Sequence, residues 1–230
     1  MKLNIITLFP EMVKNALSFG VIGKAIENDL LTLNCINPRD FAENKHNRID
    51  DKPFGGGPGM VMMYDPMHRA MESVKQQGSM GEVVFLSPQG KQLDQSLCNE
   101  LATKKCMTLV CGRYEGIDQR FVDKYVDQEI SIGDYVISGG EMAACVVIDA
   151  IGRQIKGVLG DDESAMTDSF MNGLLGIPQY TRSDLLGQSG VPEVLLRGHH
   201  QAINDWREKQ AVAITKLKRP DLLAGTSESK

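Results

Sequence analysis

Three short turns between residues 82 and 140 combine glycine with polar side chains, and each follows a strand-like apolar segment. Their sequences are LSPQGK, CGRYEG and SIGDYVISGGE. Turns that follow parallel strands meet at the carboxyl edge of a sheet, where open α/β sheets bind ligands. Glycine lets the backbone come close to a bound molecule because it has no Cβ. The exposed N–H and C=O groups can recognise the edge of an adenine, so we predict a pocket for a nucleoside-like ligand.

The common nucleotide-binding motifs do not describe this pocket. The chain has no Gly-x-x-x-x-Gly-Lys-Ser/Thr sequence, and its run GGGPG at residues 55–59 is followed by Met60 where a dinucleotide fingerprint needs glycine. That run ends a polar stretch, ENKHNRIDDKPF, and does not follow a strand. We predict a long loop over residues 43–59, and loops of that length are usually functional or disordered.

The elements that must position these turns alternate between strand and helix over the first 155 residues. Apolar runs predict strands at Leu3–Leu8, Leu30–Ile36, Glu82–Ser87 and Cys106–Cys111. Helices are predicted over residues 13–28 with a break near Gly20, from Asp65 to about Gln77, over 92–103 and over 141–155. We expect Asp65 to cap its helix, with Pro66 at the first helical position. The alternation predicts an α/β domain with a parallel sheet.

The chain changes character from about residue 157. The stretch GVLGDDESAMTDSF is acidic and has no clear periodicity, so we interpret it as an interdomain linker. Beyond it, one face of an amphipathic helix is predicted from apolar spacing of three and four, at Ile203, Trp206, Gln210, Ile214 and Leu217. From Arg197 to Arg219, six Lys and Arg against two Asp and Glu give a local charge of +4.

Composition excludes several classes of protein. The 230 residues are 42% hydrophobic and 24% charged, as in a globular chain that folds without disulfides or metal. The net charge of −5 argues against coating nucleic acid through general positive charge. The five cysteines form no C-x-x-C pair and are expected to be buried free thiols. Without a signal peptide's apolar core, and with no apolar run near the ~20 residues of a membrane span, a soluble cytoplasmic protein is expected.

Read together, the motifs resemble the bacterial tRNA (guanine-N1)-methyltransferases. The segments that carry the resemblance run in order along nearly the whole chain: LFPEM, RDF at 39–41, KPFGGGPGMVM at 52–62, LSPQGK, CGRYEGIDQR, EISIGDYVISGGE, DSF at 168–170 and GLL…PQYTR. The resemblance implies methyl transfer from S-adenosylmethionine to N1 of guanosine 37, next to the tRNA anticodon, by a homodimer whose active site is shared between subunits. It also implies a SPOUT-type α/β fold with a deep C-terminal trefoil knot, which periodicity alone cannot indicate because un-knotted chains are the default.

The resemblance also divides the chain into parts. Residues 1–157 would form the methyltransferase domain, with the cofactor-binding knot at about 82–155. Residues 158–175 would be a flexible linker that carries a catalytic aspartate. Residues 176–230 would be a small all-helical domain that binds tRNA.

Two residues are candidates for the chemical step. N1 of guanine carries a proton at neutral pH, so methylation needs a base for that proton and a cation for the charge that develops on O6. The resemblance implies Asp168 as the base and Arg153 as the cation. Taken alone, Asp168 also fits a helix cap or a solvated acid, and Arg153 fits an exposed cation at a helix end.

The resemblance further implies two sets of binding residues. The cofactor contacts would be Leu86, Ser87, Pro88, Gly112, Tyr114, Glu115, Gly116, Ile132, Gly133, Asp134, Tyr135, Val136, Ile137, Gly139 and Gly140. Glu115 would also be an oxygen ligand for Mg²⁺. The tRNA contacts would be Asp50, Gly55 and Gly59 near the flipped base, and Arg182, Arg207, Lys216 and Arg219 in the C-terminal part.

Three positions depart from the family's pattern. Gly176 stands where an acidic residue usually reaches the partner's cofactor. The family's Leu-Ser-Gly-Asn-His becomes Leu-Arg-Gly-His-His at residues 196–200, and Ser183 follows Tyr180-Thr181-Arg182 where proline is usual. We expect His199 to add a ring that can stack on a base. Two other functions remain open. A related SPOUT enzyme that methylates a ribose or another base is disfavoured by Asp168, and a non-catalytic RNA-binding protein is disfavoured by the retained glycines.

Overall fold

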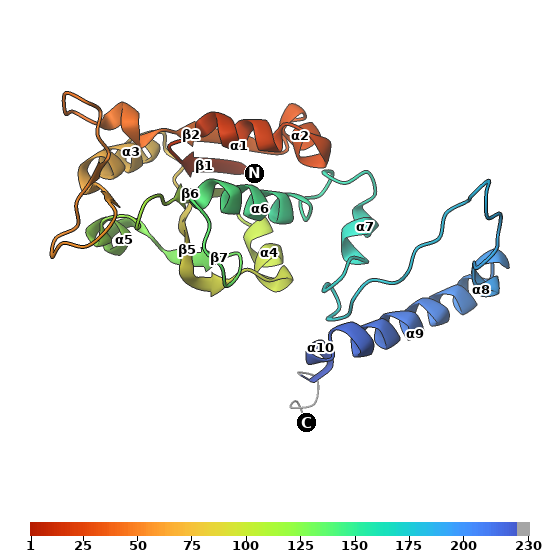
Figure 1. Cartoon of the computed structure of the whole chain (residues 1–230). Helices are drawn as coiled ribbons and strands as arrows, with labels where there is room; N and C mark the ends of the chain where they lie inside the picture. The colour runs from red at the N-terminus through yellow and green to blue at the C-terminus, as the bar shows by residue number, and fades with distance from the viewer. Residues whose placement is uncertain (225–230) are drawn as a thin grey trace. The chain divides into compact units, whose positions relative to one another are not determined.

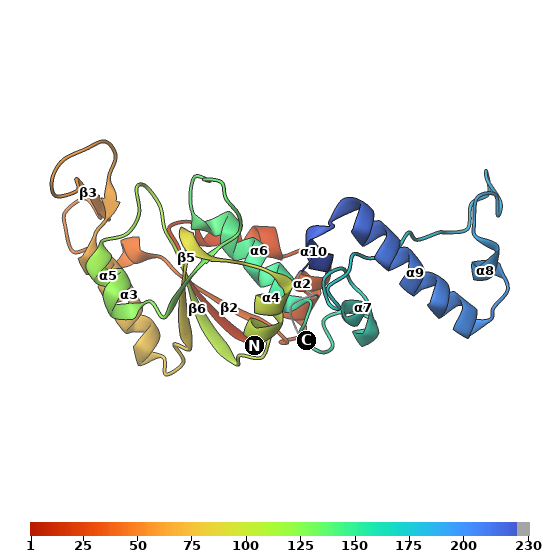
Figure 2. The ribbon, with the colours of Figure 1, turned by 90° about the horizontal axis from the view of Figure 1, so that it is seen from below.

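The computed structural model describes residues 1–224, apart from the side chains of Asp162 and Glu163 (Figures 1 and 2). The chain divides into two compact units, one ending at Asp162 and one beginning at Glu163. The strands of the first unit are β1 (Lys2–Ile6), β2 (Thr32–Ile36), β3 (Asp50–Asp51), β4 (Val61–Met62), β5 (Glu82–Gln92), β6 (Cys106–Cys111) and β7 (Gln128–Ser131). Its helices are α1 (Pro10–Leu17), α2 (Gly20–Glu27), the 3₁₀ turn η1 (Pro38–Phe41), α3 (Tyr64–Gln76), α4 (Gln95–Ala102), α5 (Gln119–Tyr125) and α6 (Gly140–Gly152).

A five-stranded parallel sheet organises the first unit. Its strand order is β2-β1-β6-β5-β7, and each neighbouring pair runs parallel. The prediction of an α/β unit with a parallel sheet is therefore confirmed. Strands β3 and β4 form a separate antiparallel pair at the two ends of the glycine-rich loop.

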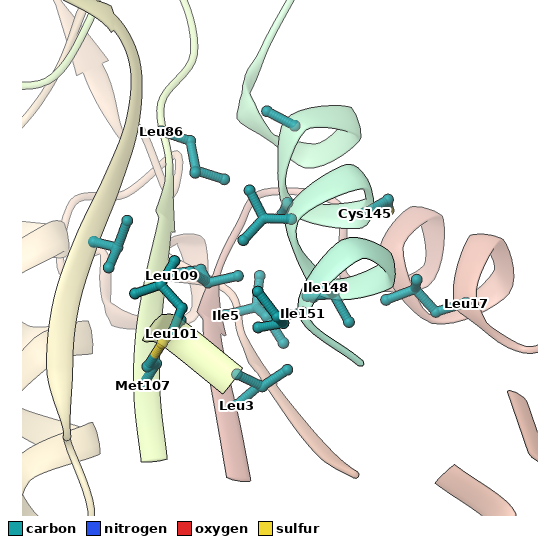
Figure 3. Packing of buried hydrophobic residues seen from close by; sticks show 14 of the residues in the cluster. Leu3, Ile5, Leu17, Leu86, Leu101, Met107, Leu109, Cys145, Ile148 and Ile151 are labelled. Carbon is teal, nitrogen blue, oxygen red and sulfur yellow. The ribbon is translucent and has the colours of Figure 1, made fainter. Parts of the chain in front are cut away.

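Helices cover both faces of the sheet, which explains why its strands are apolar on both sides. On one face, Leu3, Ile5 and Leu109 pack against Ile148 and Ile151 of α6 (Figure 3). This cluster also includes α1, α2 and α4. On the other face, a second cluster joins the sheet to α3 and α5, and Figure 2 shows these two helices side by side.

The five cysteines are free thiols, and three of them, Cys98, Cys111 and Cys145, are buried. Cys35 and Cys106 are only half-buried, contrary to the prediction, because β2 is an edge strand and Cys106 begins its strand. Burial raises the pKa of Cys35 to about 11 and that of Cys111 well above the usual thiol range.

Two local predictions in the first unit were wrong. The segment LSPQGK continues strand β5, which pairs with β7 before and after a register break between Leu86 and Lys91. Backbone pairing with β7 overrides a composition that is typical of turns. Helix α3 begins at Tyr64 after Met63, so Asp65 lies in its first turn and does not cap it. Pro66 is the third helical residue, where its missing N–H costs no helical hydrogen bond.

The second unit contains α7 (Asp162–Met166), α8 (Glu193–Leu196), α9 (His200–Lys218) and α10 (Asp221–Ala224). Helix α9 confirms the predicted amphipathic helix, except that Leu217 is 80% exposed. Thr215 is buried instead: its hydroxyl donates to the Ala211 carbonyl at 2.7 Å and accepts from the Leu175 N–H at 2.9 Å. Within residues 1–224, no helix combines the length and hydropathy needed to cross a bilayer.

Candidate active site

A cavity of about 320 Å³ lies where the chain leaves β6 and β7, beside β5. Three segments of chain provide most of its lining, at residues 85–89, 112–117 and 129–140. The three glycine-containing segments singled out in the sequence therefore meet at one cavity, as predicted. The volume falls in the range of small-molecule sites.

Most of the predicted cofactor contacts line this cavity. They are Leu86, Ser87, Pro88, Gly112, Tyr114, Glu115, Gly116, Ile132, Gly133, Tyr135, Val136, Ile137, Gly139 and Gly140. Asp134 is exposed and is not among the lining residues. The role of these residues in cofactor binding stays a prediction.

Helix α6 begins directly against the end of β6, which closes one side of the cavity. The Gly140 N–H donates to the Gly112 carbonyl at 2.9 Å, and a Cβ on Gly140 would lie 2.7 Å from the Cα of Cys111. Only glycine allows this approach. Tyr114, on the adjoining loop, has a left-handed φ of 61°, an unfavourable conformation for a bulky residue that is typical of functional sites.

Sequence reasoning missed several lining residues, namely Phe85, Gln89, Arg113, Ile117, Gln119, Val122, Glu129, Ile130, Ser131, Ser138 and Ala143. Arg113 lies inside the motif CGRYEG, and Glu129, Ser131 and Ser138 lie inside EISIGDYVISGGE. Their positions in these motifs were the available signal. Phe85, Val122 and Ala143 lie outside these motifs and gave no signal, because an apolar residue that faces a cavity resembles one that faces the core.

The glycine-rich loop is attached to the rim of this cavity. The Glu115 N–H donates to the Met60 carbonyl and the Met62 N–H donates to the Gly116 carbonyl, both at 2.9 Å. Gly59 lies against the Glu115 side chain, and Gly55 lies further out in the connection between β3 and β4. The predicted base-binding loop therefore meets the predicted cofactor loop.

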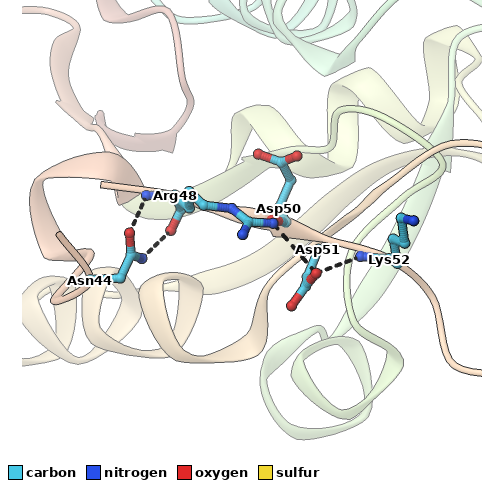
Figure 4. A network of polar contacts seen from close by, with 5 residues as sticks. All are labelled: Asn44, Arg48, Asp50, Asp51 and Lys52. Atoms are coloured by element: carbon cyan, nitrogen blue, oxygen red, sulfur yellow. Dashed lines mark hydrogen bonds and ion pairs between the residues drawn. The ribbon is translucent and has the colours of Figure 1, made fainter. Parts of the chain in front are cut away.

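Side-chain hydrogen bonds order the chain that leads into this loop (Figure 4). The Asn44 amide donates to the Arg48 carbonyl and accepts from the Arg48 N–H, both at 2.7 Å. The Arg48 guanidinium lies 3.5 Å from the Asp51 carboxylate, which also accepts from the Lys52 N–H at 2.8 Å. These contacts fix the backbone on both sides of Asp50.

A second cavity of about 750 Å³ is lined by both ends of the glycine-rich loop and by the start of α5. Its lining includes Asp51, Phe54, Tyr64 and Arg120. The Phe54 side chain is almost fully exposed at this rim. An aromatic ring beside a cation suits the stacking of a base.

The two predicted catalytic residues belong to different units. Arg153 is half-buried and immediately follows α6, where its N–H bonds the Asp149 carbonyl at 3.2 Å. Asp168 is exposed and follows α7 in the second unit. Neither residue is among the described residues that line the cavity of 320 Å³. Near Asp168, the Gly176 N–H donates to the Ser169 hydroxyl at 2.8 Å.

The basic C-terminal residues differ in their surroundings. Arg182, Arg207 and Lys216 are exposed. Arg219 forms a two-pronged ion pair with Asp221, with Nη2 at 2.6 Å and Nε at 2.9 Å from carboxylate oxygens, and this hydrogen bonding raises the pKa of Arg219. His199 caps α9, because its Nδ1 accepts from the Ala202 N–H at 3.1 Å.

The fold and the cavity define an α/β protein with a small-molecule-sized cavity between loops at the ends of parallel strands. Over residues 1–225 the sequence matches the family of tRNA (guanine-1)-methyltransferases, TrmD, and the chain belongs to that family.

Relatives in three bacteria agree with this family. Each is a tRNA (guanine-N(1)-)-methyltransferase. That of Halorhodospira halophila is 51% identical and covers 97% of this chain and 85% of its own length. That of Haemophilus influenzae is 50% identical, covering 98% of this chain and 92% of its own length. That of Glaesserella parasuis is 50% identical, covering 97% and 89%.

Proposed function

We propose that this protein transfers the methyl group of S-adenosylmethionine to N1 of guanosine 37 in tRNA, in the bacterial cytoplasm where tRNA is used. The observation that carries the proposal is that the family's glycine-containing motifs meet at one cavity, that of about 320 Å³. The names of the relatives supply the base and the atom that is methylated.

The lining of the cavity fits this methyl donor. Apolar side chains such as Leu86, Ile132 and Ile137 suit the adenine ring, and backbone groups of the glycine-containing loops can bind its edge. The carboxylates of Glu115 and Glu129 suit a positively charged sulfonium. When bound, S-adenosylmethionine supplies an electrophilic methyl group.

Two side chains of the protein would then act on the N1 proton and on the negative charge that develops on O6 of the guanine. We assign Asp168 to accept the proton that leaves N1 as the methyl group arrives, and Arg153 to offset negative charge on O6. Support comes from the DSF motif around Asp168 and from the place of Arg153 at the end of α6, the helix that begins at the cavity.

We propose that the active site is shared within a homodimer. Helices α1 and α6 lie side by side (Figure 1) and carry the exposed apolar side chains of Met12, Met142 and Val146, next to Phe9. An apolar patch of this kind is typical of an interface, and a second copy of the chain is the occupant that a shared site requires. Residues 158–175 would then act as the flexible linker that brings Asp168 to the partner's cofactor.

We also propose the deep trefoil knot over about residues 82–155. It is supported by contacts between segments distant in sequence, because α6 begins against β6 and the Leu93 N–H donates to the Ser131 carbonyl at 2.8 Å.

The target base would leave the anticodon stack, since chemistry on a base edge requires its extrusion. We propose that the loop with Asp50, Gly55 and Gly59 receives the base, and that residues 176–230 bind the tRNA phosphates through Arg182, Arg207, Lys216 and Arg219. The exposed positions of Arg207 and Lys216 on α9 support this assignment.

The resemblance adds Mg²⁺ with Glu115 as an oxygen ligand. Across the described part of the chain, no group of three or more His, Cys, Asp and Glu side chains is arranged to hold a metal ion. Glu115 alone does not make a resident metal site, and the proposed proton acceptor and cation are Asp168 and Arg153 without Mg²⁺.

Calorimetry with S-adenosylmethionine, followed by methyl transfer to unmodified bacterial tRNA, tests the proposal. The matched substrate is the same tRNA with adenosine in place of guanosine 37. We expect N1-methylguanosine from the first tRNA and no methylation of the second. A 2′-O-methylated product would favour a ribose-methylating SPOUT enzyme. Binding of both ligands without transfer would favour a non-catalytic RNA-binding protein.

A further inference from the structure

Glu141 is a fully buried carboxylate in the first turn of α6, and the proposed methyl transfer gives it no role. One of its oxygens accepts from the Thr7 hydroxyl at 2.9 Å, and the other accepts from Arg113 Nε at 2.8 Å. A buried carboxylate is costly unless it is paired and fully hydrogen-bonded. Glu141 meets that requirement, because both of its oxygens are hydrogen-bonded and its partner Arg113 lines the cavity.

Arg113 also contacts the segment that precedes α6. Its Nη1 donates to the Ser138 carbonyl at 3.1 Å, and a Cβ on Gly139 would lie 2.1 Å from its Nε. The guanidinium therefore occupies space that only glycine at position 139 leaves open. One side chain ties the loop after β6 to the loop after β7, and both loops line the cavity.

Two further contacts hold this guanidinium. The Phe9 ring lies over it, with 4.5 Å between its central carbon and the ring centroid. Glu141 in turn is held by Thr7, which follows β1, an interior strand of the sheet. The pair is thus anchored to the sheet on one side and shielded by an aromatic ring on the other.

From this geometry we infer that Arg113 and Glu141 are positioning residues that hold the two loops at the spacing needed to bind S-adenosylmethionine. The inference rests on the proposed function, since it takes that molecule as the occupant of the cavity. The guanidinium makes these contacts with two separate nitrogens, Nε to Glu141 and Nη1 to Ser138, whereas lysine has a single nitrogen. Without Arg113, the loops after β6 and β7 would adopt the spacing that binds S-adenosylmethionine only part of the time. The apparent affinity for S-adenosylmethionine would fall in proportion to that fraction.

The test measures the Kd for S-adenosylmethionine by calorimetry and the Tm of the ligand-free protein. Arg113→Lys keeps a charge opposite Glu141 but replaces the two nitrogens that make the contacts with one. We expect its Kd to rise about tenfold while the ligand-free protein remains folded at the temperature of the titration. Arg69→Lys is the matched control, because the Arg69 guanidinium also contacts a carboxylate, that of Glu43, and a backbone carbonyl, that of Phe41, but lies outside this cavity, and its Kd should stay within twofold of wild type.

A second variant covers the case in which Arg113→Lys does not fold. The double variant Arg113→Met, Glu141→Gln removes both charges and leaves no buried ion unpaired. We expect it to fold and to bind S-adenosylmethionine at least about tenfold more weakly.

If Arg113→Lys or the double variant folds and binds S-adenosylmethionine as tightly as wild type, the positioning role is wrong, while the proposed function stands. A lowered Tm with an unchanged Kd would show that the pair only stabilises the fold. A wild-type protein that fails to bind S-adenosylmethionine would instead overturn the proposed function, and the inference with it.

Discussion

Asp168 and Arg153 would divide the chemical step between a proton acceptor and a cation. Asp168→Asn keeps the size and a hydrogen-bonding group but cannot take the N1 proton at neutral pH. We expect turnover to fall by about 10²–10⁴ while the affinities for S-adenosylmethionine and tRNA stay within a few-fold. Single-turnover kinetics with nucleoside analysis measures the effect. Near-normal rates of N1-methylguanosine formation would remove Asp168 from the mechanism, and Asp184→Asn, in the same unit, is the control for loss of an exposed acid.

Arg153→Ala should lower turnover on the order of 10²–10³, because it removes the charge opposite the developing O6 anion. If Arg153 and Asp168 act on one transition state, the double variant should lose less than the product of the two single losses. The same single-turnover assay measures all three variants. Strictly multiplicative losses would indicate that the two residues act independently.

At the scale of elements, the N-terminus of α5 offers a test of stability against pH. Asp118 accepts from the Arg120 N–H at 3.0 Å, and hydrogen bonding to the Arg120 side chain lowers the pKa of Asp118. A carboxylate whose pKa is lower in the folded state stabilises the fold above its unfolded pKa of about 3.9. That stabilisation is lost as the pH falls through the folded value.

Asp118→Ala should therefore cost about 1 kcal/mol at pH 7, as expected for a lost cap. The cost should shrink when the pH is lowered to roughly 3. Urea unfolding of both proteins at the two pH values measures the difference. Asp123→Ala, an exposed acid on the same helix, should show a smaller change, and an Asp118 cost that is constant with pH would contradict the ionic contribution.

Helix α9 carries the prediction for tRNA. Arg207→Ala and Lys216→Ala should each weaken tRNA binding and reduce the slope of log affinity against log salt by about one, as expected for loss of one phosphate contact. Arg219→Ala should change the slope less, because its guanidinium is engaged with Asp221. Titrations at several salt concentrations provide the measurement, with Lys24→Ala in the first unit as the control. An unchanged slope in the Arg207 and Lys216 variants would exclude phosphate contacts there.

The fold was predictable from sequence where hydrophobic pattern alone decides an element. The buried strands β1 and β6 and the apolar helix α6 are such cases. Strand β5 beyond Leu86 was not, because its pairing depends on β7: Lys91 pairs with Ile130 and Gln92 with Ser131, which lie far along the chain. The candidate site also has parts that were predictable from sequence and parts that were not. The glycine-containing loops were visible as motifs, whereas the Arg113–Glu141 pair depends on contacts that no local pattern records.

At the scale of the whole molecule, a shared active site predicts complementation between subunits. Val at position 140 would bring its Cβ to 2.7 Å from the Cα of Cys111, so Gly140→Val should abolish cofactor binding. Mixed dimers of Asp168→Ala and Gly140→Val chains should regain part of the activity, because one composite site is intact. Absence of recovery after verified subunit exchange would contradict a shared site, as would a fully active monomer in sedimentation at micromolar concentration.

Contacts near the cavity join residues that are far apart in the sequence, and this affects how the protein folds while it is being synthesised. Strand β1 pairs with β6, and Thr7 bonds Glu141, a residue 134 positions further along the chain. A ribosome makes proteins from the N-terminus, so β1 can pair with β2 early but must wait for β6, and Thr7 must wait for Glu141. Nascent chains that end before α6 would thus lack a finished methyl-donor pocket, and the enzyme would be able to bind its cofactor only after residues 140–152 had been made.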